Sequence, residues 1–330
     1  MATQLYDNHN RPIQYLRLAV TDRCNLRCHY CMPENMQFVP RKDLLTYEEM
    51  LRLTSILASL GVSKVRITGG EPFMRRDIMS FLENLTKIKG IEQVAITTNG
   101  VTTLKYLEDL KSIGITSLNL SLDTLDEARF LEITRRDCFQ DVIETMNKAL
   151  DMGFSLKINA VVMEGKNTQD IIALTRLAQT RKIDVRFIEE MPFNGKGSNY
   201  PTLNWTYKSI IKEIKNVFPD MERLQDPIGS TSQNFTIPGF KGSVGVIPAF
   251  TRTFCSECNR IRVTALGILK TCLYDDGVYN LRDLLRSEKD DYQIKEKLIE
   301  LIQKRSKDGF EAEKNRTTGE VTESMSTIGG

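Results

Sequence analysis

The chain has 330 residues, of which 41% are hydrophobic and 27% charged, and its formal net charge is +2 at pH 7. A chain of this length and composition can bury a large core without disulfides, and the small net charge does not indicate a nucleic-acid partner. The first residues carry no apolar signal segment, and no run approaches the roughly eighteen apolar residues of a membrane span. We therefore expect a cytoplasmic protein without a membrane anchor, whose seven cysteines bind metal or react as thiols.

Short β-branched runs alternate with longer amphipathic segments over the first part of the chain, which is typical of repeated strand and helix units. Thr46 and Glu49 form the pattern of a capping box at the start of the first helix. The expected strands span residues 15–21, 64–70, 93–99, 117–123, 155–163 and 184–191. The expected helices span residues 46–60, 76–88, 104–113, 139–152 and 168–180.

Glycines or polar side chains stand where these strands end. "GGEP" (69–72) ends the second strand, "TTNG" (97–100) the third and "SLD" (121–123) the fourth. A barrel brings the C-terminal ends of all its strands to one face, whereas a doubly wound open sheet has its site mainly at one switch point. The expected fold class is therefore α/β, an incomplete (βα)6 TIM-type barrel that is laterally open and closed by a smaller C-terminal region.

The composition changes near residue 195, where glycine, proline, asparagine and serine accumulate. We expect residues 1–194 to form the partial barrel with the first cysteine set. Residues 195–310 would carry the second set and cover the barrel, and residues 311–330 would be a flexible tail that ends in Gly-Gly.

Three cysteines, Cys24, Cys28 and Cys31, lie within the eight residues "CNLRCHYC". A structural zinc ion is almost always held by four protein ligands, and the neighbouring candidate His29 would share a very tight loop with all three thiols. An iron–sulfur cube accepts three cysteines and leaves one iron open for another ligand. The ligand count favours the cube, with zinc as the alternative.

A second set of three cysteines, Cys255, Cys258 and Cys272, again lacks a fourth ligand. A second open cubane is therefore favoured over an incomplete zinc ribbon. Arg260 and Arg262 alternate on an expected strand, so both side chains lie on one face. Two adjacent guanidinium groups suit a phosphate, and a solvated basic edge strand is the alternative.

The first cysteine set followed by "GGEP" resembles the radical S-adenosylmethionine (SAM) superfamily. With "RITGGEP", "TTNG", "SLD", "RFIEEM", "CSECNRIR" and the terminal "GG" added, the chain resembles more narrowly the GTP 3′,8-cyclase family of molybdenum cofactor biosynthesis. This resemblance runs from about Arg11 to Gly330. It implies a lyase with two [4Fe-4S] clusters at the ends of a channel, with SAM bound at the first and GTP at the second.

The implied reaction converts GTP to (8S)-3′,8-cyclo-7,8-dihydroguanosine 5′-triphosphate after a 5′-deoxyadenosyl radical removes the ribose 3′ hydrogen. The implied cluster ligands are Cys24, Cys28, Cys31, Cys255, Cys258 and Cys272. The implied SAM contacts are Tyr30, Gly69, Gly70, Glu71, Ser121 and Met191, and the implied GTP contacts are Arg17, Arg66, Thr97, Lys157, Arg260 and Arg262. Catalytic roles would fall to Arg17, Arg260, Arg262, Gly329 and Gly330.

The implied partners are an external one-electron reductant and cyclic pyranopterin monophosphate synthase, which would receive the product; a homodimer is left open. Two other functions are kept as alternatives. One is a radical SAM enzyme with another substrate, such as a peptide-modifying enzyme with an auxiliary cluster, although such enzymes usually have more C-terminal cysteines. The other is a zinc-dependent nucleic-acid-binding module, which would be colourless where iron–sulfur protein is brown.

Overall fold

A computed structural model describes residues 4–193, 203–317 and 323–329. All six expected strands are present and confirmed, each ending one or two residues earlier than expected. In β5, the buried residues alternate with half-buried ones such as Lys157 and Asn159, because successive side chains of a strand point to opposite faces. The strands are β1 (Tyr15–Ala19), β2 (Lys64–Thr68), β3 (Gln93–Thr98), β4 (Ser117–Ser121), β5 (Ser155–Val162) and β6 (Asp184–Glu189).

The expected helices are also confirmed, with shorter bounds at most ends. Thr46 and Glu49 form both hydrogen bonds of the predicted capping box. One helix in this part of the chain, α4, was not expected; Asp126 caps it by accepting from the N–H of Arg129. The helices are α1 (Tyr47–Ser59), α2 (Ile78–Thr86), α3 (Leu107–Ser112), α4 (Glu127–Thr134), α5 (Phe139–Asp151) and α6 (Ile171–Thr180).

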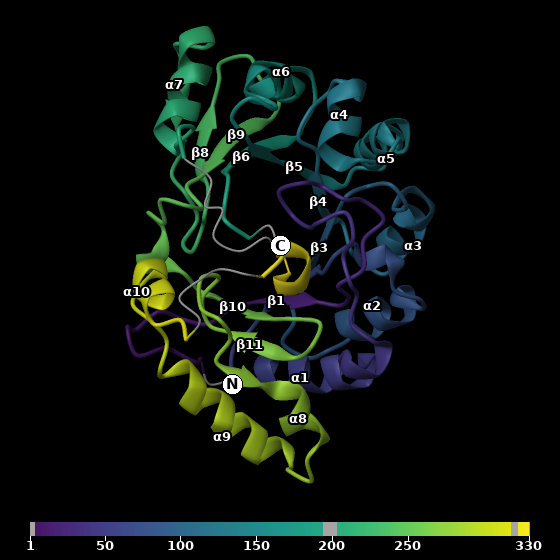
Figure 1. The fold of residues 1–330 in the computed structure, drawn as a ribbon, viewed down its shortest axis with the longest axis vertical. Helices are drawn as coiled ribbons and strands as arrows, with labels where there is room; N and C mark the ends of the chain where they lie inside the picture. The colour runs from purple at the N-terminus through teal and green to yellow at the C-terminus, as the bar shows by residue number, and fades with distance from the viewer. Residues whose placement is uncertain (1–3, 194–202, 318–322, 330) are drawn as a thin grey trace.

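One sheet runs through the molecule in the order β12-β11-β10-β1-β2-β3-β4-β5-β6-β9-β8-β7. The strands from β10 to β9 in this order are parallel, whereas the strands beyond each of them pair antiparallel. Helices α1 to α6 lie around the outside of the curved sheet (Figure 1). The linear order, with β12 and β7 at the two edges, makes the fold an open partial barrel, as expected.

The C-terminal region extends the sheet on both sides. Its strand β9 (Ser243–Ile247) pairs parallel with β6, and β10 (Arg260–Val263) pairs parallel with β1, which places Arg262 beside Arg17. The other elements of this region are α7 (Tyr207–Val217), β7 (Glu222–Arg223), β8 (Gln233–Thr236), β11 (Ile268–Lys270), β12 (Tyr279–Asn280), α8 (Leu281–Arg286), α9 (Asp291–Ile302), α10 (Gly309–Lys314) and α11 (Met325–Ile328).

The expected tail, residues 311–330, is folded in the parts that the structure describes. Helix α10 crosses the expected boundary at residue 310, and residues 323–329 are folded into the middle of the molecule (Figure 1). Ser324, Ser326 and Ile328 are buried there, so the tail packs where the structure describes it. The other expected boundary, after residue 194, falls at residues outside those described.

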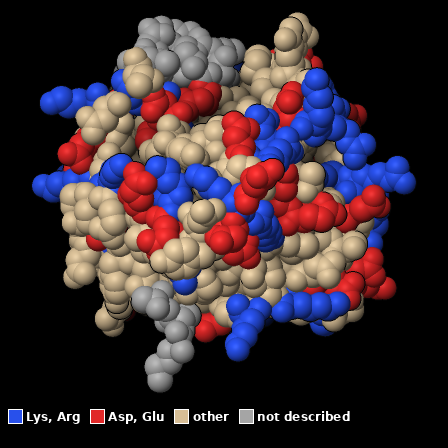
Figure 2. Space-filling model, turned by 90° about the horizontal axis from the view of Figure 1, so that it is seen from below, with Lys and Arg blue, Asp and Glu red and all other residues tan. Residues whose placement is uncertain are grey.

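Charged side chains of both signs are mixed over the face in Figure 2, which carries no large patch of one sign. None of the helices in the described ranges has both the length and the hydropathy needed to cross a membrane. Positive side chains are concentrated instead inside the barrel.

Candidate functional site

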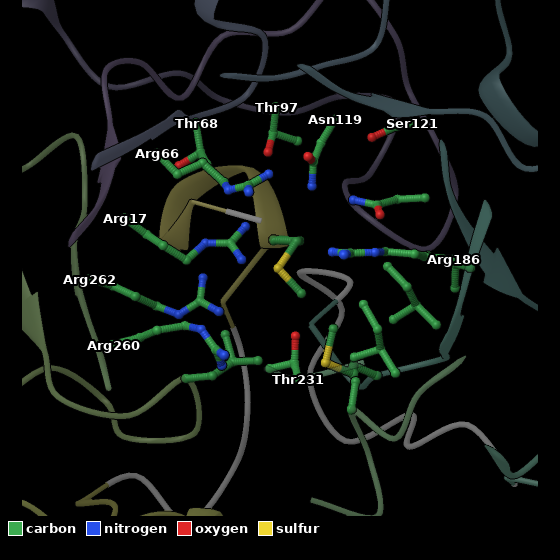
Figure 3. A pocket seen from close by; sticks show the side chains of 18 of the residues that line it. Arg17, Arg66, Thr68, Thr97, Asn119, Ser121, Arg186, Thr231, Arg260 and Arg262 are labelled. Atoms are coloured by element: carbon green, nitrogen blue, oxygen red, sulfur yellow. The ribbon is translucent and has the colours of Figure 1, made fainter. Parts of the chain in front are cut away.

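A cavity of about 520 Å³ fills the barrel and is lined by all six cysteines of the two sets. Its wall is formed along the length of the strands, from Tyr15 and Lys64 at the start of β1 and β2 to the loops that follow the carboxyl ends. Figure 3 shows Arg17, Arg262 and Arg260 side by side, with Arg186 pointing in from the opposite side. The cavity therefore joins two thiol clusters and a group of guanidinium ions in one space.

The first cysteine set lies in the loop after β1. The Cys24 sulfur accepts hydrogen bonds from the N–H of Leu26 at 3.4 Å and from Asn99 Nδ2 at 3.5 Å. Burial and the Glu71 carboxylate raise the pKa of Cys24 to about 11, and burial and Cys24 raise the pKa of Cys31 to about 12. Buried thiols of this kind become stable thiolates when metal cations bind them.

The geometry of the cysteines fits a cubane better than a single ion. Within residues 4–193, 203–317 and 323–329, no three histidine, cysteine or acidic side chains converge closely enough to hold one metal ion. A cubane distributes its thiolate ligands over separate irons, so its cysteines stand further apart. Three half-buried cysteines that line one cavity are a suitable donor set for an iron–sulfur cluster with one open iron.

The glycines of "GGEP" allow two backbone segments to approach closely. A Cβ on Gly69 would lie 2.4 Å from the Thr21 carbonyl oxygen, and one on Gly70 would lie 2.2 Å from the Arg23 carbonyl oxygen. The N–H of Gly70 donates to Thr21, so the end of β2 is fixed against the chain that leads to Cys24. Both glycines line the cavity beside the first cysteine set.

Glu71 does not line the cavity wall among the described residues. Its buried carboxylate accepts hydrogen bonds from the N–H of Phe73, the Thr98 hydroxyl and the N–H of Asn99. Burial raises the pKa of Glu71 to about 7. In this structure the carboxylate orients Asn99, whose side chain reaches the Cys24 sulfur.

The expected SAM contacts Tyr30, Ser121 and Met191 all line the cavity. The Tyr30 hydroxyl donates to Asp123 Oδ2 at 2.9 Å, and the other oxygen of Asp123 accepts from the N–H of Val161 at 2.8 Å. Asp123 therefore fixes the ring of Tyr30, which identifies the aspartate of "SLD" as the residue that positions this aromatic.

The first cysteine set follows β1, whereas Cys255 and Cys258 precede β10, which runs parallel to β1, so the two sets lie at opposite ends of these strands. Burial raises the pKa of Cys272 to about 12, whereas Arg305 and Arg260 lower the pKa of Cys258 to about 7 although burial opposes this. Burial and the neighbouring Arg260 lower the pKa of Arg262 to about 10. Closely spaced cations of this kind are stabilised by an anion between them.

The cavity wall contains buried polar atoms that have no hydrogen-bond partner among the described residues. They include Arg66 Nη1, Arg186 Nε, Thr97 Oγ1 and Asn119 Oδ1. Buried polar atoms are rarely left without partners, so a polar ligand with several acceptors is expected to fill this space. A triphosphate nucleotide has the required charge and number of oxygen atoms.

Sequence reasoning did not assign Tyr15, Lys64 and Arg186, all of which line the cavity. A charged or phenolic side chain inside an expected strand could have indicated these cavity residues, and Arg186 within the sixth expected strand is the clearest case. Lys157, which was assigned, lines the cavity but also pairs with Asp184. The structure therefore brings the expected GTP contacts together and adds cations to them.

Tyr15 leads to a prediction on pH. Burial would raise its pKa, but Arg66, Arg17 and Lys64 lower the pKa of Tyr15 to about 8. A bound triphosphate would raise this pKa again, so binding takes up a proton and becomes weaker as the pH rises above about 8. Calorimetric GTP titrations at pH 7 and pH 9 should show this loss in the wild type and a smaller one in Tyr15→Phe. Equal pH dependence in both proteins would contradict the assignment.

The C-terminal segment contacts both the loop of the first cysteine set and one of the cavity arginines. The Ser324 hydroxyl donates to the Cys31 carbonyl, and the Gly329 carbonyl accepts from Arg262 Nη1 at 2.8 Å. Gly329 has a φ of +77°, and a Cβ on it would lie 2.8 Å from Thr68 Oγ1. Gly330, which was also expected to be catalytic, lies outside the described residues.

An ion cluster anchors this segment. The Glu323 carboxylate accepts from Lys270 Nζ at 2.9 Å and from Arg316 Nη2 at 2.6 Å. Lys270 and Arg316 are both buried, so their charges need the carboxylate. The N–H of Met325 donates to the Phe193 carbonyl at 2.9 Å, which fixes the start of α11.

The chain matches the family model of the Radical SAM superfamily over residues 18–178 and that of Molybdenum Cofactor Synthesis C over residues 183–311. A solved structure of similar fold is that of Streptococcus suis SuiB bound to precursor peptide SuiA, with a TM-score of 0.63 and 17% identity, covering 87% of this chain and 68% of that one. The partial barrel, the cysteine set after β1 and the glycine-rich end of β2 thus define a radical SAM protein.

Named relatives identify the family of this chain within the radical SAM superfamily. The chain is 42% identical to the mitochondrial GTP 3′,8-cyclase of Arabidopsis thaliana over 90% of its own length and 76% of the relative. It is 40% identical to the GTP 3′,8-cyclase of Clostridium perfringens over 88% of its own length and 90% of the relative. The chain belongs to the GTP 3′,8-cyclase family. It spans about half the length of other relatives, such as 45% of molybdenum cofactor biosynthesis protein 1 of Bos taurus, to which it is 41% identical over 86% of its own length.

Proposed function

We propose that this chain converts GTP to (8S)-3′,8-cyclo-7,8-dihydroguanosine 5′-triphosphate, the first step of molybdenum cofactor biosynthesis. The observation that carries the proposal is one cavity with a cysteine set at each end and a group of arginines beside the second set. Family membership supports the reaction, and the buried polar atoms without partners support a polyanionic substrate.

Two [4Fe-4S] clusters would be held by Cys24, Cys28 and Cys31 and by Cys255, Cys258 and Cys272. When bound and reduced by an external donor, the first cluster would supply the electron for the reductive cleavage of SAM to methionine and a 5′-deoxyadenosyl radical. Tyr30, oriented by Asp123, would hold the adenine, and Gly69, Gly70, Ser121 and Met191 would line the SAM site, with Glu71 supporting it through Asn99. The protein's task is to place SAM and GTP so that the radical meets one C–H bond.

The GTP end of the cavity would be held by the cationic wall. Arg17, Arg260 and Arg262 would bind the triphosphate and orient the ribose, with Arg66, Thr97, Lys157 and Arg186 completing the wall. Burial within the barrel would exclude water, which would otherwise quench a primary radical. Gly329, and Gly330 after it, would hold Arg262 in its catalytic position.

Iron content provides a direct test of the two clusters. We expect about eight irons per chain after anaerobic reconstitution, because each three-cysteine set can hold one cubane. The double variant Cys255→Ala/Cys258→Ala should retain about four irons and the SAM-dependent spectrum of the first cluster. If iron reaches only about four in the wild type, and the double variant has the same spectrum, the second cluster is absent.

We further propose an external one-electron reductant, transfer of the product to cyclic pyranopterin monophosphate synthase, and action in a reducing compartment such as the cytoplasm. None of the seven cysteines forms a disulfide, which supports a reducing environment. A homodimer remains a proposal that sedimentation can test. The peptide-modifying alternative rests on a shared fold alone, because its structural representative is only 17% identical.

Turnover tests the function itself. Anaerobic incubation of the reconstituted chain with SAM, a reductant and GTP should yield 5′-deoxyadenosine and the cyclised nucleotide. ATP in place of GTP should not support product formation. If SAM is cleaved equally with either nucleotide and no cyclised product forms, GTP is not the substrate.

A further inference from the structure

Three charged residues that no expectation covered form a buried network behind the second cysteine set. Asp7, Arg11 and Arg305 are 4%, 5% and 3% exposed, respectively. The Asp7 carboxylate pairs with Arg11 Nε at 2.7 Å and with Arg305 Nη1 at 3.2 Å. Buried charges are costly without partners, so the contacts of this network should show what it supports.

Arg305 uses all five of its N–H donors on the segments that carry the cysteines and on Asp7. Nη2 donates to the Cys258 sulfur at 3.0 Å and to the Arg260 carbonyl at 3.0 Å. Nη1 donates to the Cys258 carbonyl at 2.7 Å as well as to Asp7, and Nε donates to the Thr271 carbonyl at 2.9 Å. Because Thr271 precedes Cys272, one guanidinium joins two of the three cysteine segments.

Arg11 holds the third segment. Its Nη1 donates to the Cys255 carbonyl at 3.0 Å and to the Lys307 carbonyl at 2.6 Å. Asp7 fixes Arg11 further by accepting from its backbone N–H at 2.9 Å. The network therefore contacts every cysteine segment of the second set. Most of these contacts are to backbone carbonyls, whereas Arg305 also donates to a cysteine sulfur, that of Cys258.

We propose that Arg305 is a positioning residue for the second metal centre, which it serves by donating a charged hydrogen bond to the Cys258 sulfur. This inference rests on the proposed function, because it requires a cluster on the second cysteine set. A donor to a ligating thiolate withdraws electron density from the sulfur, which raises the reduction potential of a cluster. The same withdrawal makes an open metal position a better acceptor for a donor atom of the nucleotide.

Three full-length variants, reconstituted with both clusters, test this role. Arg305→Met removes the charge and the donors, whereas Arg305→Lys keeps the charge but loses the fixed planar fork. Arg52→Met is the control, since Arg52 also donates to an aspartate, Asp291, and to two backbone carbonyls, but does not line the cavity. The measurement is a redox titration followed by electron paramagnetic resonance, using the signal that responds to added GTP and not to SAM.

We expect the potential of the GTP-responsive signal to become more negative in Arg305→Met and to shift less in Arg305→Lys. The SAM-responsive signal should keep its potential in both, and Arg52→Met should leave both signals unchanged. If loaded Arg305→Lys and Arg305→Met have the wild-type potential, the inference is wrong while the proposed function stands. An Arg305→Lys chain that unfolds or loses both clusters would assign Arg305 to folding alone and also overturn the inference. A wild type without any GTP-responsive signal would refute the proposed second cluster itself.

Discussion

Deleting Gly329 and Gly330 is expected to reduce product formation and GTP-dependent SAM cleavage by roughly ten- to a hundredfold, the size of one lost charge-assisted hydrogen bond. The reason is the contact between the Gly329 carbonyl and Arg262 Nη1, which fixes this guanidinium in the cavity wall. Iron content and GTP affinity should stay near the wild-type values, because the cysteines and the other cations are unchanged. Turnover assays and calorimetry measure the two effects separately.

A pair of single substitutions refines this experiment. Gly329→Ala places a Cβ 2.8 Å from Thr68 Oγ1 and 3.1 Å from Ala19 Cβ, at a φ of +77°. Gly165→Ala is the matched control, because Gly165 has a φ of +70° but no atom within 4 Å of the added Cβ. We expect loss of turnover in Gly329→Ala and wild-type turnover in Gly165→Ala. A truncated chain that turns over GTP at the full-length rate would contradict a catalytic role for the tail.

The double variant Arg260→Ala/Arg262→Ala is expected to lose GTP affinity while keeping its affinity for SAM. Each charge-assisted contact to a phosphate contributes about 1.5 to 3 kcal/mol, which corresponds to about ten- to over a hundredfold in affinity. Calorimetry with each ligand measures this directly. Arg52→Ala serves as control, since Arg52 binds Asp291 and two backbone carbonyls on the outer helices. Unchanged GTP affinity in the double variant would mean that these arginines do not bind the nucleotide.

The sequence predicted the partial barrel well because its local patterns repeat. Each strand of β1 to β6 carries apolar residues at alternate positions, and the capping box of α1 is complete within Thr46 and Glu49. The side-by-side placement of Arg260 and Arg262 followed from the period of a strand and is confirmed by β10. Helix α4 was missed because its few apolar residues give a weak helical pattern over eight residues.

Contacts between distant parts of the chain could not be predicted in this way. No local pattern indicates that Tyr15 of β1 pairs with Arg260 of β10, or that Ser324 reaches Cys31. For Glu71, the motif predicted a contact to a ligand. In the structure its carboxylate accepts hydrogen bonds from Thr98 and Asn99 instead. Such side-chain contacts depend on how several elements pack together, and the spacing of residues along the sequence does not specify this packing.

The fate of the ribose 3′ hydrogen tests the central claim most directly. GTP carrying deuterium at C3′ is incubated anaerobically with the reconstituted chain, SAM and a reductant, and the 5′-deoxyadenosine formed is analysed by mass spectrometry. We predict that this 5′-deoxyadenosine gains one deuterium while the cyclised nucleotide forms, and that GTP deuterated at C2′ transfers none. Unlabelled 5′-deoxyadenosine from the C3′-deuterated substrate, without a cyclised nucleotide, would contradict the account.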